Sequence, residues 1–328
     1  MSGFYPVPPT LTARLVAKVP SELYAQRETE WLLPSTLKPP PIFLEGITTD
    51  TNGNLYVVDV PYGRVLKLDL HGSGEFSVVT EWDGEPNGLA LRDDGTLVVA
   101  DYKQGVLRLD PADGKVTPLL TRRNLERFKG PNDLIYAKNG DMYFTDQGQT
   151  GLTDPTGHVY RLGPTGKLDA LITNGPSPNG LVLSPDERFL YVAMTRDNSV
   201  WRCPLHQDGT TTKVKQPIPN PPHPVTSFGT SGPDGLTVDS LGNLFICHPG
   251  LSCVFVVEPT GIPKARIIIP GPGGAAGKAH VTNCIFGSTA ADSQTLYFVD
   301  SSGAGIYAVD WEAPAGTPLR ASKATIGP

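Results

Sequence analysis

The sequence predicts an all-β fold, a six-bladed β-propeller whose blades each contain four antiparallel strands. Two observations carry this prediction. Six short apolar runs each open on an acidic or amide residue, and each is followed by a second apolar strand that ends at Asp, Met or His. The openings recur in steps of 42, 45, 47, 55 and 49 residues, which is within or close to the repeat length of a four-stranded blade. We call these openings the blade heads: Glu45, Asn87, Asn132, Asn179, Asp234 and Asn283.

The first repeat shows the order of strands within a blade. An alternating strand from Glu45 leads to a turn at Asn52-Gly53, and the strand LYVVD follows. GRVLKLDL from Gly63 is the third strand and EFSVVTEW from Glu75 the fourth. Equivalent third strands recur in every later repeat, so the blades are expected to start near residues 45, 87, 132, 179, 234 and 283.

The last repeat lacks a fourth strand of its own, whereas a strand-like run, TARLVAKV at residues 12–19, precedes the first head. A ring with a free edge would expose unpaired backbone groups. We therefore predict that this N-terminal run pairs with blade six and closes the ring. Residues 1–328 are predicted to form a single propeller domain, and the tail from about Glu312 is expected to be irregular.

The composition narrows the choice of partners and compartment. A net charge of -6 with no cluster of Lys or Arg argues against a nucleic-acid binder. The chain shows neither a signal peptide nor an apolar run long enough to span a membrane, and its four cysteines are too few for a disulfide framework. We expect a cytoplasmic protein with reduced thiols that acts on a small molecule; its oligomeric state is not indicated.

Topology places all six heads together. In an up-and-down blade the first strand lies nearest the central channel, so the heads should surround one mouth of that channel. Asn or Asp before Gly often only makes a turn, which is the simpler interpretation of any single head. That interpretation fits the whole set less well, because Glu45 is a poor turn former.

These residues resemble those of the SMP-30/gluconolactonase/luciferin-regenerating family of calcium-dependent propellers, and the pattern is also similar to that of diisopropylfluorophosphatase. In those proteins, heads of the form Glu-Gly, Asn-Asp, Pro-Asn-Gly and Pro-Asp-Gly on blades one, three, four and five bind one divalent ion. The matching residues here are Glu45, Asn132, Asn179 and Asp234. The resemblance covers almost the whole chain.

Two carboxylates and two amide oxygens suit a hard cation that keeps positions open for water and substrate. Calcium is the first choice, with magnesium, manganese or zinc as alternatives. Such an ion polarises a carbonyl or phosphoryl oxygen and acidifies bound water. The resemblance implies a lactonase in which Asp234 acts as general base and Glu45 as an electrostatic ligand. His248, which ends the second strand of blade five, is an alternative base or substrate contact.

The remaining site predictions concern specificity. Asn87, Asn283, Tyr102 and His248 are candidate substrate contacts at the mouth. Sugar-lactone members of the family carry an Arg two residues before the head of blade three, where this chain has Gly130. That difference favours a less hydroxylated or bulkier lactone or ester. Residues 20–44 and 206–233 are expected to form long loops over the same mouth.

Three functions stay open at this point. The leading one is a metal-dependent hydrolase that opens a lactone or related cyclic ester. The second is a phosphotriesterase-like hydrolase, and the third is a propeller that binds a ligand or catalyses a non-hydrolytic step. A complete set of four oxygen ligands argues against a metal-free propeller.

Overall fold

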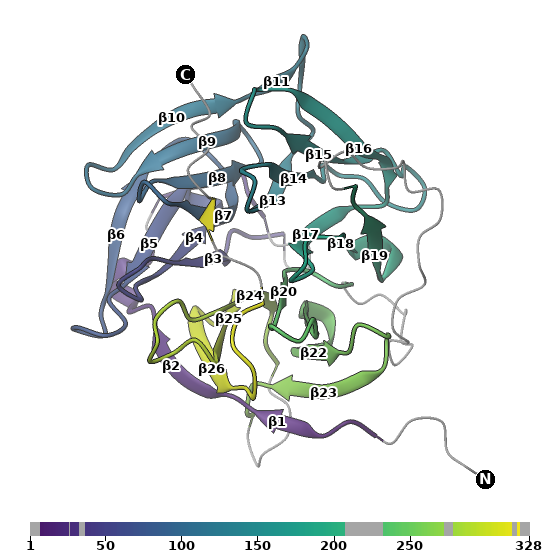
Figure 1. Ribbon diagram of the computed structural model, residues 1–328. Coiled ribbons are helices and arrows are strands. Elements are labelled where there is room, and N and C mark those ends of the chain that lie inside the picture. Colours follow the sequence, from purple (N-terminus) through teal and green to yellow (C-terminus); the bar gives the residue numbers. More distant parts are fainter. Residues whose placement is uncertain are drawn as a thin grey trace.

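The computed structural model describes residues 7–25, 27–32, 37–206, 232–271, 278–316 and 320–321. Six antiparallel sheets stand around a central axis as the blades of a propeller, which confirms the predicted fold (Figure 1). Blades one to three consist of β3 (Leu44–Thr49), β4 (Leu55–Asp59), β5 (Arg64–Leu68) and β6 (Phe76–Glu81); β7 (Pro86–Arg92), β8 (Leu97–Asp101), β9 (Gly105–Asp110) and β10 (Lys115–Leu120); and β13 (Pro131–Tyr136), β14 (Met142–Asp146), β15 (Gly157–Leu162) and β16 (Leu168–Gly175).

Blade four is described as far as its third strand, and blades five and six take strands from the N-terminus. The strands are β17 (Pro178–Leu183), β18 (Phe189–Met194) and β19 (Ser199–Pro204); β20 (Leu236–Val238), β21 (Leu244–His248), β22 (Cys253–Val257) and β23 (Pro263–Ile268); and β24 (Val281–Phe286), β25 (Thr295–Asp300) and β26 (Gly305–Asp310). Four short 3-10 helices join them: η1 (Ser21–Leu23), η2 (Val60–Tyr62), η3 (Thr195–Asp197) and η4 (Pro249–Leu251).

The core lies between the blades. Second strands such as β4, β8 and β21 are buried along their whole length, because each packs against neighbouring blades on both faces. Aromatic side chains fill the wedge between blades five and six, where the rings of Phe245 and Phe286 meet edge to face at 5.1 Å. Burying a side chain of this size stabilises the fold by about 1.5–3 kcal/mol.

The N-terminal run closes the ring as predicted. β2 (Arg14–Lys18) pairs antiparallel with β26 and supplies the missing fourth strand of blade six. The structure adds a second contact, because β1 (Thr10–Thr12) pairs in parallel with β23 of blade five. The N-terminus therefore joins the last two blades to each other as well as completing one of them.

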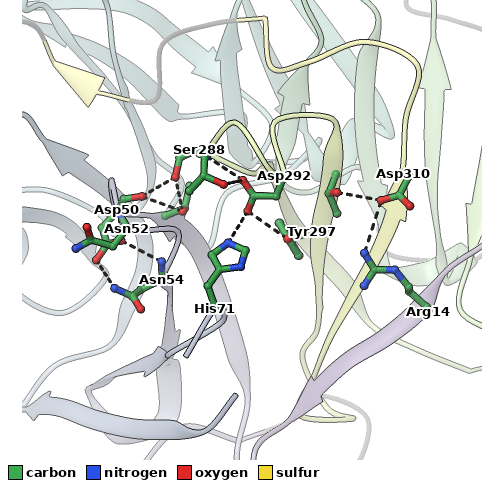
Figure 2. Close-up of polar contacts among 12 residues, drawn as sticks. Arg14, Asp50, Asn52, Asn54, His71, Ser288, Asp292, Tyr297 and Asp310 are labelled. Carbon is green, nitrogen blue, oxygen red and sulfur yellow. Dashed lines mark hydrogen bonds and ion pairs between the residues drawn. The ribbon is translucent and has the colours of Figure 1, made fainter. Parts of the chain in front are cut away.

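Polar contacts reinforce the junction of blades one and six at the end of the channel opposite the heads (Figure 2). The Ser288 hydroxyl donates to the carbonyl oxygen of Asp50, and His71 Nε2 lies 3.3 Å from Asp292 Oδ2. Tyr297 donates to the same Asp292 oxygen at 3.3 Å. The contacts of Ser288 and His71 join turns that are over two hundred residues apart in sequence, so they stabilise the closed ring.

The C-terminal tail is not irregular throughout, contrary to the sequence-based expectation. Ala315 forms a bridge with Asp239, and β27 (Arg320–Ala321) pairs in parallel with the end of β7. The Trp311 indole N–H also donates to Asp239 Oδ2 at 2.9 Å. These partners lie where the innermost strands β20 and β7 end, which is the side of the channel opposite the heads. None of the helices in the described part of the chain is long and apolar enough to cross a membrane.

Candidate metal and substrate site

Five of the six blade heads lie at an irregularity in their own sheet. The innermost strands β3, β7, β13, β17 and β24 all show a register shift at or directly after the head. Such bulges re-aim side chains and are frequent beside active sites. The heads therefore leave the regular alternation of their strands at the mouth of the channel.

The glycine that follows four of the heads allows the innermost strands to approach one another closely. A Cβ added at any of these glycines would lie far inside van der Waals contact of the next head. The collisions are Gly46 with Asn87 O at 2.2 Å, Gly88 with Asn132 O at 2.7 Å, Gly180 with Asp234 O at 2.4 Å and Gly235 with Asn283 Cα at 2.6 Å. Glycine is required at these positions because the innermost strands pack closely around the ring, and not because a turn needs it.

Two carboxylates meet at the mouth. Glu45 and Asp234 are 6% and 8% exposed, and they lie close enough for the charge of Asp234 to act on Glu45. Burial raises the pKa of Glu45 well above its ordinary value, and the charge of Asp234 raises it further. Burial also raises the pKa of Asp234, followed by the charge of Asp133. The side chains of Thr282 and Asn179 donate hydrogen bonds to Glu45 and Asp234 respectively.

Asp133 is a third buried carboxylate, and sequence reasoning did not select it. Its Oδ1 accepts the backbone N–H of Leu134 at 2.8 Å, and the Asn283 side chain donates to it from the opposite side of the channel. Burial raises the pKa of Asp133 from 3.8 to about 7. A cavity of about 70 Å³ in the channel is lined by Asp133 and Asn283. The sequence does contain one indication of its importance: the head Asn132 is followed by Asp, whereas four of the other heads are followed by Gly.

The amide of Asn132 is oriented by its neighbours. Its Nδ2 donates to Gln147 Oε1 at 3.1 Å, and Gln147 Nε2 in turn donates to Ser177 Oγ at 3.0 Å. Asn132 is 3% exposed, and its Oδ1 has no hydrogen-bond partner among the described residues. A buried oxygen without a partner costs about 1–3 kcal/mol, so this oxygen calls for a ligand.

Asn87 and Asn283 differ in how far their side chains are engaged. Asn87 is half-buried, and its carbonyl oxygen is the group that faces Gly46. Asn283 Oδ1 accepts the backbone N–H of Cys284 at 2.8 Å while its amide donates to Asp133. The Asn283 side chain is thus held within the channel; substrate contacts by either residue stay predictions.

Comparison with known proteins decides the family. The family described as SMP-30/Gluconolactonase/LRE-like region matches residues 43–293. The chain belongs to this family. It is 33% identical over 277 residues to a gluconolactonase from Zymomonas mobilis, an alignment that covers 77% of this chain and 74% of that protein.

Solved structures agree with this membership of the SMP-30/gluconolactonase/LRE-like family. A gluconolactonase from Xanthomonas campestris superimposes with a TM-score of 0.66 and 26% identity, over 82% of this chain and 86% of that one. A calcium-binding regucalcin from Agrobacterium tumefaciens has a TM-score of 0.69 and 19% identity, over 95% and 98% of the two chains, which shows a shared fold.

The structure gives a steric reason for Gly130, the position at which this SMP-30/gluconolactonase/LRE-like chain departs from the sugar-lactone pattern. A Cβ at Gly130 would lie 2.4 Å from the ring of Tyr102. Gln149 Nε2 fixes that ring by donating to Tyr102 Oη at 3.0 Å. Tyr102 therefore fills the space into which a side chain at position 130 would project.

His248, the last residue of β21, is held by contacts with neighbouring side chains. Its imidazole is 0% exposed, Nε2 is 3.1 Å from Asn198 Oδ1, and its ring meets Phe255 edge to face at 5.9 Å. At the equivalent strand end of other blades, Asp101 and Asp146 accept backbone N–H groups from the chain that leads into the head. A role for His248 in catalysis or substrate binding stays a prediction.

The described parts of the loop at residues 20–44 contact the blade on the side of the heads, and their position over the mouth stays a prediction. Thr29 Oγ1 donates to Pro61 O, and Tyr62 Oη donates to Pro40 O, both at 2.7 Å. These contacts attach the loop to the turn between β4 and β5, which is on the side of the heads. Most of the second expected loop, residues 206–233, lies outside the described residues.

Proposed function

We propose that this protein is a metal-dependent lactonase in which Glu45, Asn132, Asn179 and Asp234 hold one divalent cation at the mouth of the channel. Calcium is the first choice, with magnesium, manganese and zinc as alternatives. The observation that carries the proposal is the buried Asn132 Oδ1, which has no partner among the described residues and stands at the same mouth as two buried carboxylates.

The donor set fits a hard cation. Two carboxylates and two amide oxygens provide four oxygen ligands, and the two negative charges would be offset by a divalent ion. Without a cation, burial and mutual repulsion disfavour the charged forms of Glu45 and Asp234. Within the described residues no three His, Cys, Asp or Glu side chains form a metal cluster.

The side chains around the ligands would maintain the site. Gln147 turns the Asn132 amide so that its oxygen stays free for the ion, which is the usual task of outer-shell partners. Asn179 donates to one oxygen of Asp234, so the carboxylate keeps a fixed orientation. A bound divalent ion supplies Lewis acidity, which polarises the lactone carbonyl and lowers the pKa of water.

Asp234 is the base that the contacts favour. A carboxylate at the mouth can take the proton of the attacking water and pass it to the ring oxygen as the acyl–oxygen bond breaks. His248, the alternative, is fully buried and hydrogen-bonded to Asn198, so it would have to leave these contacts to reach a substrate. Glu45, which accepts from Thr282 and its own neighbouring N–H, serves as an electrostatic ligand.

The proposed substrate is a lactone that does not depend on an Arg at position 130. Support for the lactone class comes from the 33% identical gluconolactonase of Zymomonas mobilis. The Tyr102 ring fills the space beside Gly130, the position at which the family resemblance implies an Arg that can hold substrate hydroxyls. An aromatic surface favours a less hydroxylated or bulkier substrate.

The test combines chelation with substitution. Purified protein is stripped with a chelator, reloaded with calcium, and tested on a panel of lactones and organophosphates. We expect lactone hydrolysis that the chelator abolishes and calcium restores, and a fall in kcat of at least about 100-fold in Asp234→Asn. Asp113→Asn, an exposed acid at the far face, is the matched control and should leave activity unchanged.

Three outcomes would contradict the proposal. Hydrolysis that continues in the presence of the chelator would show that the reaction does not need the ion. Full activity in Asp234→Asn would show that Asp234 is not the general base. Turnover of organophosphates without turnover of any lactone would instead support the phosphotriesterase-like alternative.

A further inference from the structure

A basic hairpin stands beside the proposed site. β11 (Arg122–Arg123) and β12 (Glu126–Arg127) pair antiparallel in the connection between β10 and β13, and β11 lies at the outer rim of the propeller (Figure 1). By the order of strands within a blade, this connection is on the side of the heads. Arg122 and Arg127 are direct cross-strand partners. Like charges in such a pair destabilise a hairpin, so a bound anion would stabilise this arrangement.

The two arginines line a cavity of about 320 Å³. Lys103 and Asp83 also border it, but they form an ion pair with each other and their charges cancel. Among the described residues, neither arginine has an acidic partner in an ion pair. Two guanidinium groups and one ammonium group therefore line the cavity against one carboxylate, on a protein whose net charge is -6.

This cavity adjoins the proposed site through Tyr102. The ring of Tyr102 borders the cavity and also packs against Gly130, which is two residues from Asn132. Phe128 adds a second aromatic surface to the same lining. A molecule that extends from the mouth past Tyr102 would meet aromatic surface first and guanidinium groups next.

We propose that the basic cavity binds an oxyanion of the substrate, so that the substrate class is a lactone with a carboxylate or phosphate separated from the ring by an apolar linker. The proposal rests on the proposed lactonase function and deepens it. Guanidinium groups bind planar oxyanions through paired, charge-assisted hydrogen bonds. Tyr102 and Phe128 contact the linker, and the anion offsets the repulsion between Arg122 and Arg127.

The experiment compares three γ-lactones that share one alkyl side chain and differ only at its end: a carboxylate, a phosphate and a neutral amide. We expect kcat/KM of the wild-type protein to be roughly tenfold higher for at least one anionic lactone than for the amide. The carboxylate and phosphate arms identify which oxyanion is preferred. The preference should decline as salt is raised, because the arginines are exposed.

Variants assign the preference to the cavity. Arg122→Gln and Arg127→Gln should each raise KM for the preferred anionic lactone with little change in kcat or in turnover of the amide, and Arg122→Lys should restore part of the loss. Arg123→Gln is the matched control, because it removes the same charge from the same hairpin while its guanidinium lies over the Tyr160 ring at 5.6 Å. Circular dichroism confirms that each variant is folded.

Two results would overturn the inference while leaving the lactonase proposal in place. One is hydrolysis of the amide lactone with no preference for either anion. The other is an equal loss in the control and in the cavity variants. If none of the three lactones is hydrolysed, the proposed function and this inference both fail.

Discussion

Removal of divalent ions should destabilise the protein more strongly as the pH rises, and Asp133 allows the size of the effect to be worked out. Burial raises the pKa of Asp133 from 3.8 to about 7 in the ion-free fold. The folded state therefore binds more protons than the unfolded chain between these values, so stability is fully present below pH 3.8 and is lost as the pH rises through 7. At about 1.4 kcal/mol per pH unit, the loss is on the order of 4 kcal/mol for this residue.

Thermal unfolding in chelator from pH 5 to 8 measures this effect. Between pH 5 and 7 the loss for Asp133 is about 3 kcal/mol, which at about 2 °C per kcal/mol corresponds to a decrease of roughly 6 °C in Tm. Glu45 and Asp234 add to it in the same direction. Asp133→Asn should decline less steeply, because it keeps the shape of the side chain without the charge. Calcium should raise Tm most at pH 8. A Tm that does not change with pH, or an equal slope in Asp133→Asn, would refute the reasoning.

Three further predictions concern positioning and packing. Gln147→Leu should weaken calcium binding by about 10- to 100-fold in calorimetry, because the ligand amide loses its orienting acceptor, and unchanged affinity would contradict that role. Gly46→Ala should abolish stable folding, since its Cβ would lie 2.2 Å from a backbone oxygen. Gly95→Ala has open space around the new Cβ and should lower the free energy of unfolding by only about 1 kcal/mol. Similar melting temperatures for the two variants would contradict this. Gly130→Ala should lower Tm in the wild-type background but much less in Tyr102→Ala, and a double-mutant cycle without coupling would show that the two residues do not compete for space.

The repeat was enough to predict the propeller and its closure, because both follow from local patterns. The spacing of the heads defines the blades, and the unpaired run at residues 12–19 matches the blade that lacks a strand. The contacts of β1 with β23 and of β27 with β7 could not be predicted in this way. Each contact involves one strand of only two or three residues, too short for any periodicity to appear.

The site was only partly accessible from the sequence. The heads could be grouped because a propeller places equivalent positions on one ring, but the reason for their glycines is contact between different blades. Asp133 was missed because its importance depends on Asn283, which reaches it from another blade. The basic hairpin was missed because Arg122 and Arg127 become neighbours only when the strands pair.

The central claim is that four head residues hold one ion, and a crystal structure of the protein grown with calcium tests it most directly. We expect a single ion within about 2.3–2.6 Å of oxygens from Glu45, Asn132, Asn179 and Asp234, with Asn132 Oδ1 among the ligands. A mouth without an ion at millimolar calcium, or an ion that leaves Asn132 Oδ1 uncoordinated, would contradict the account.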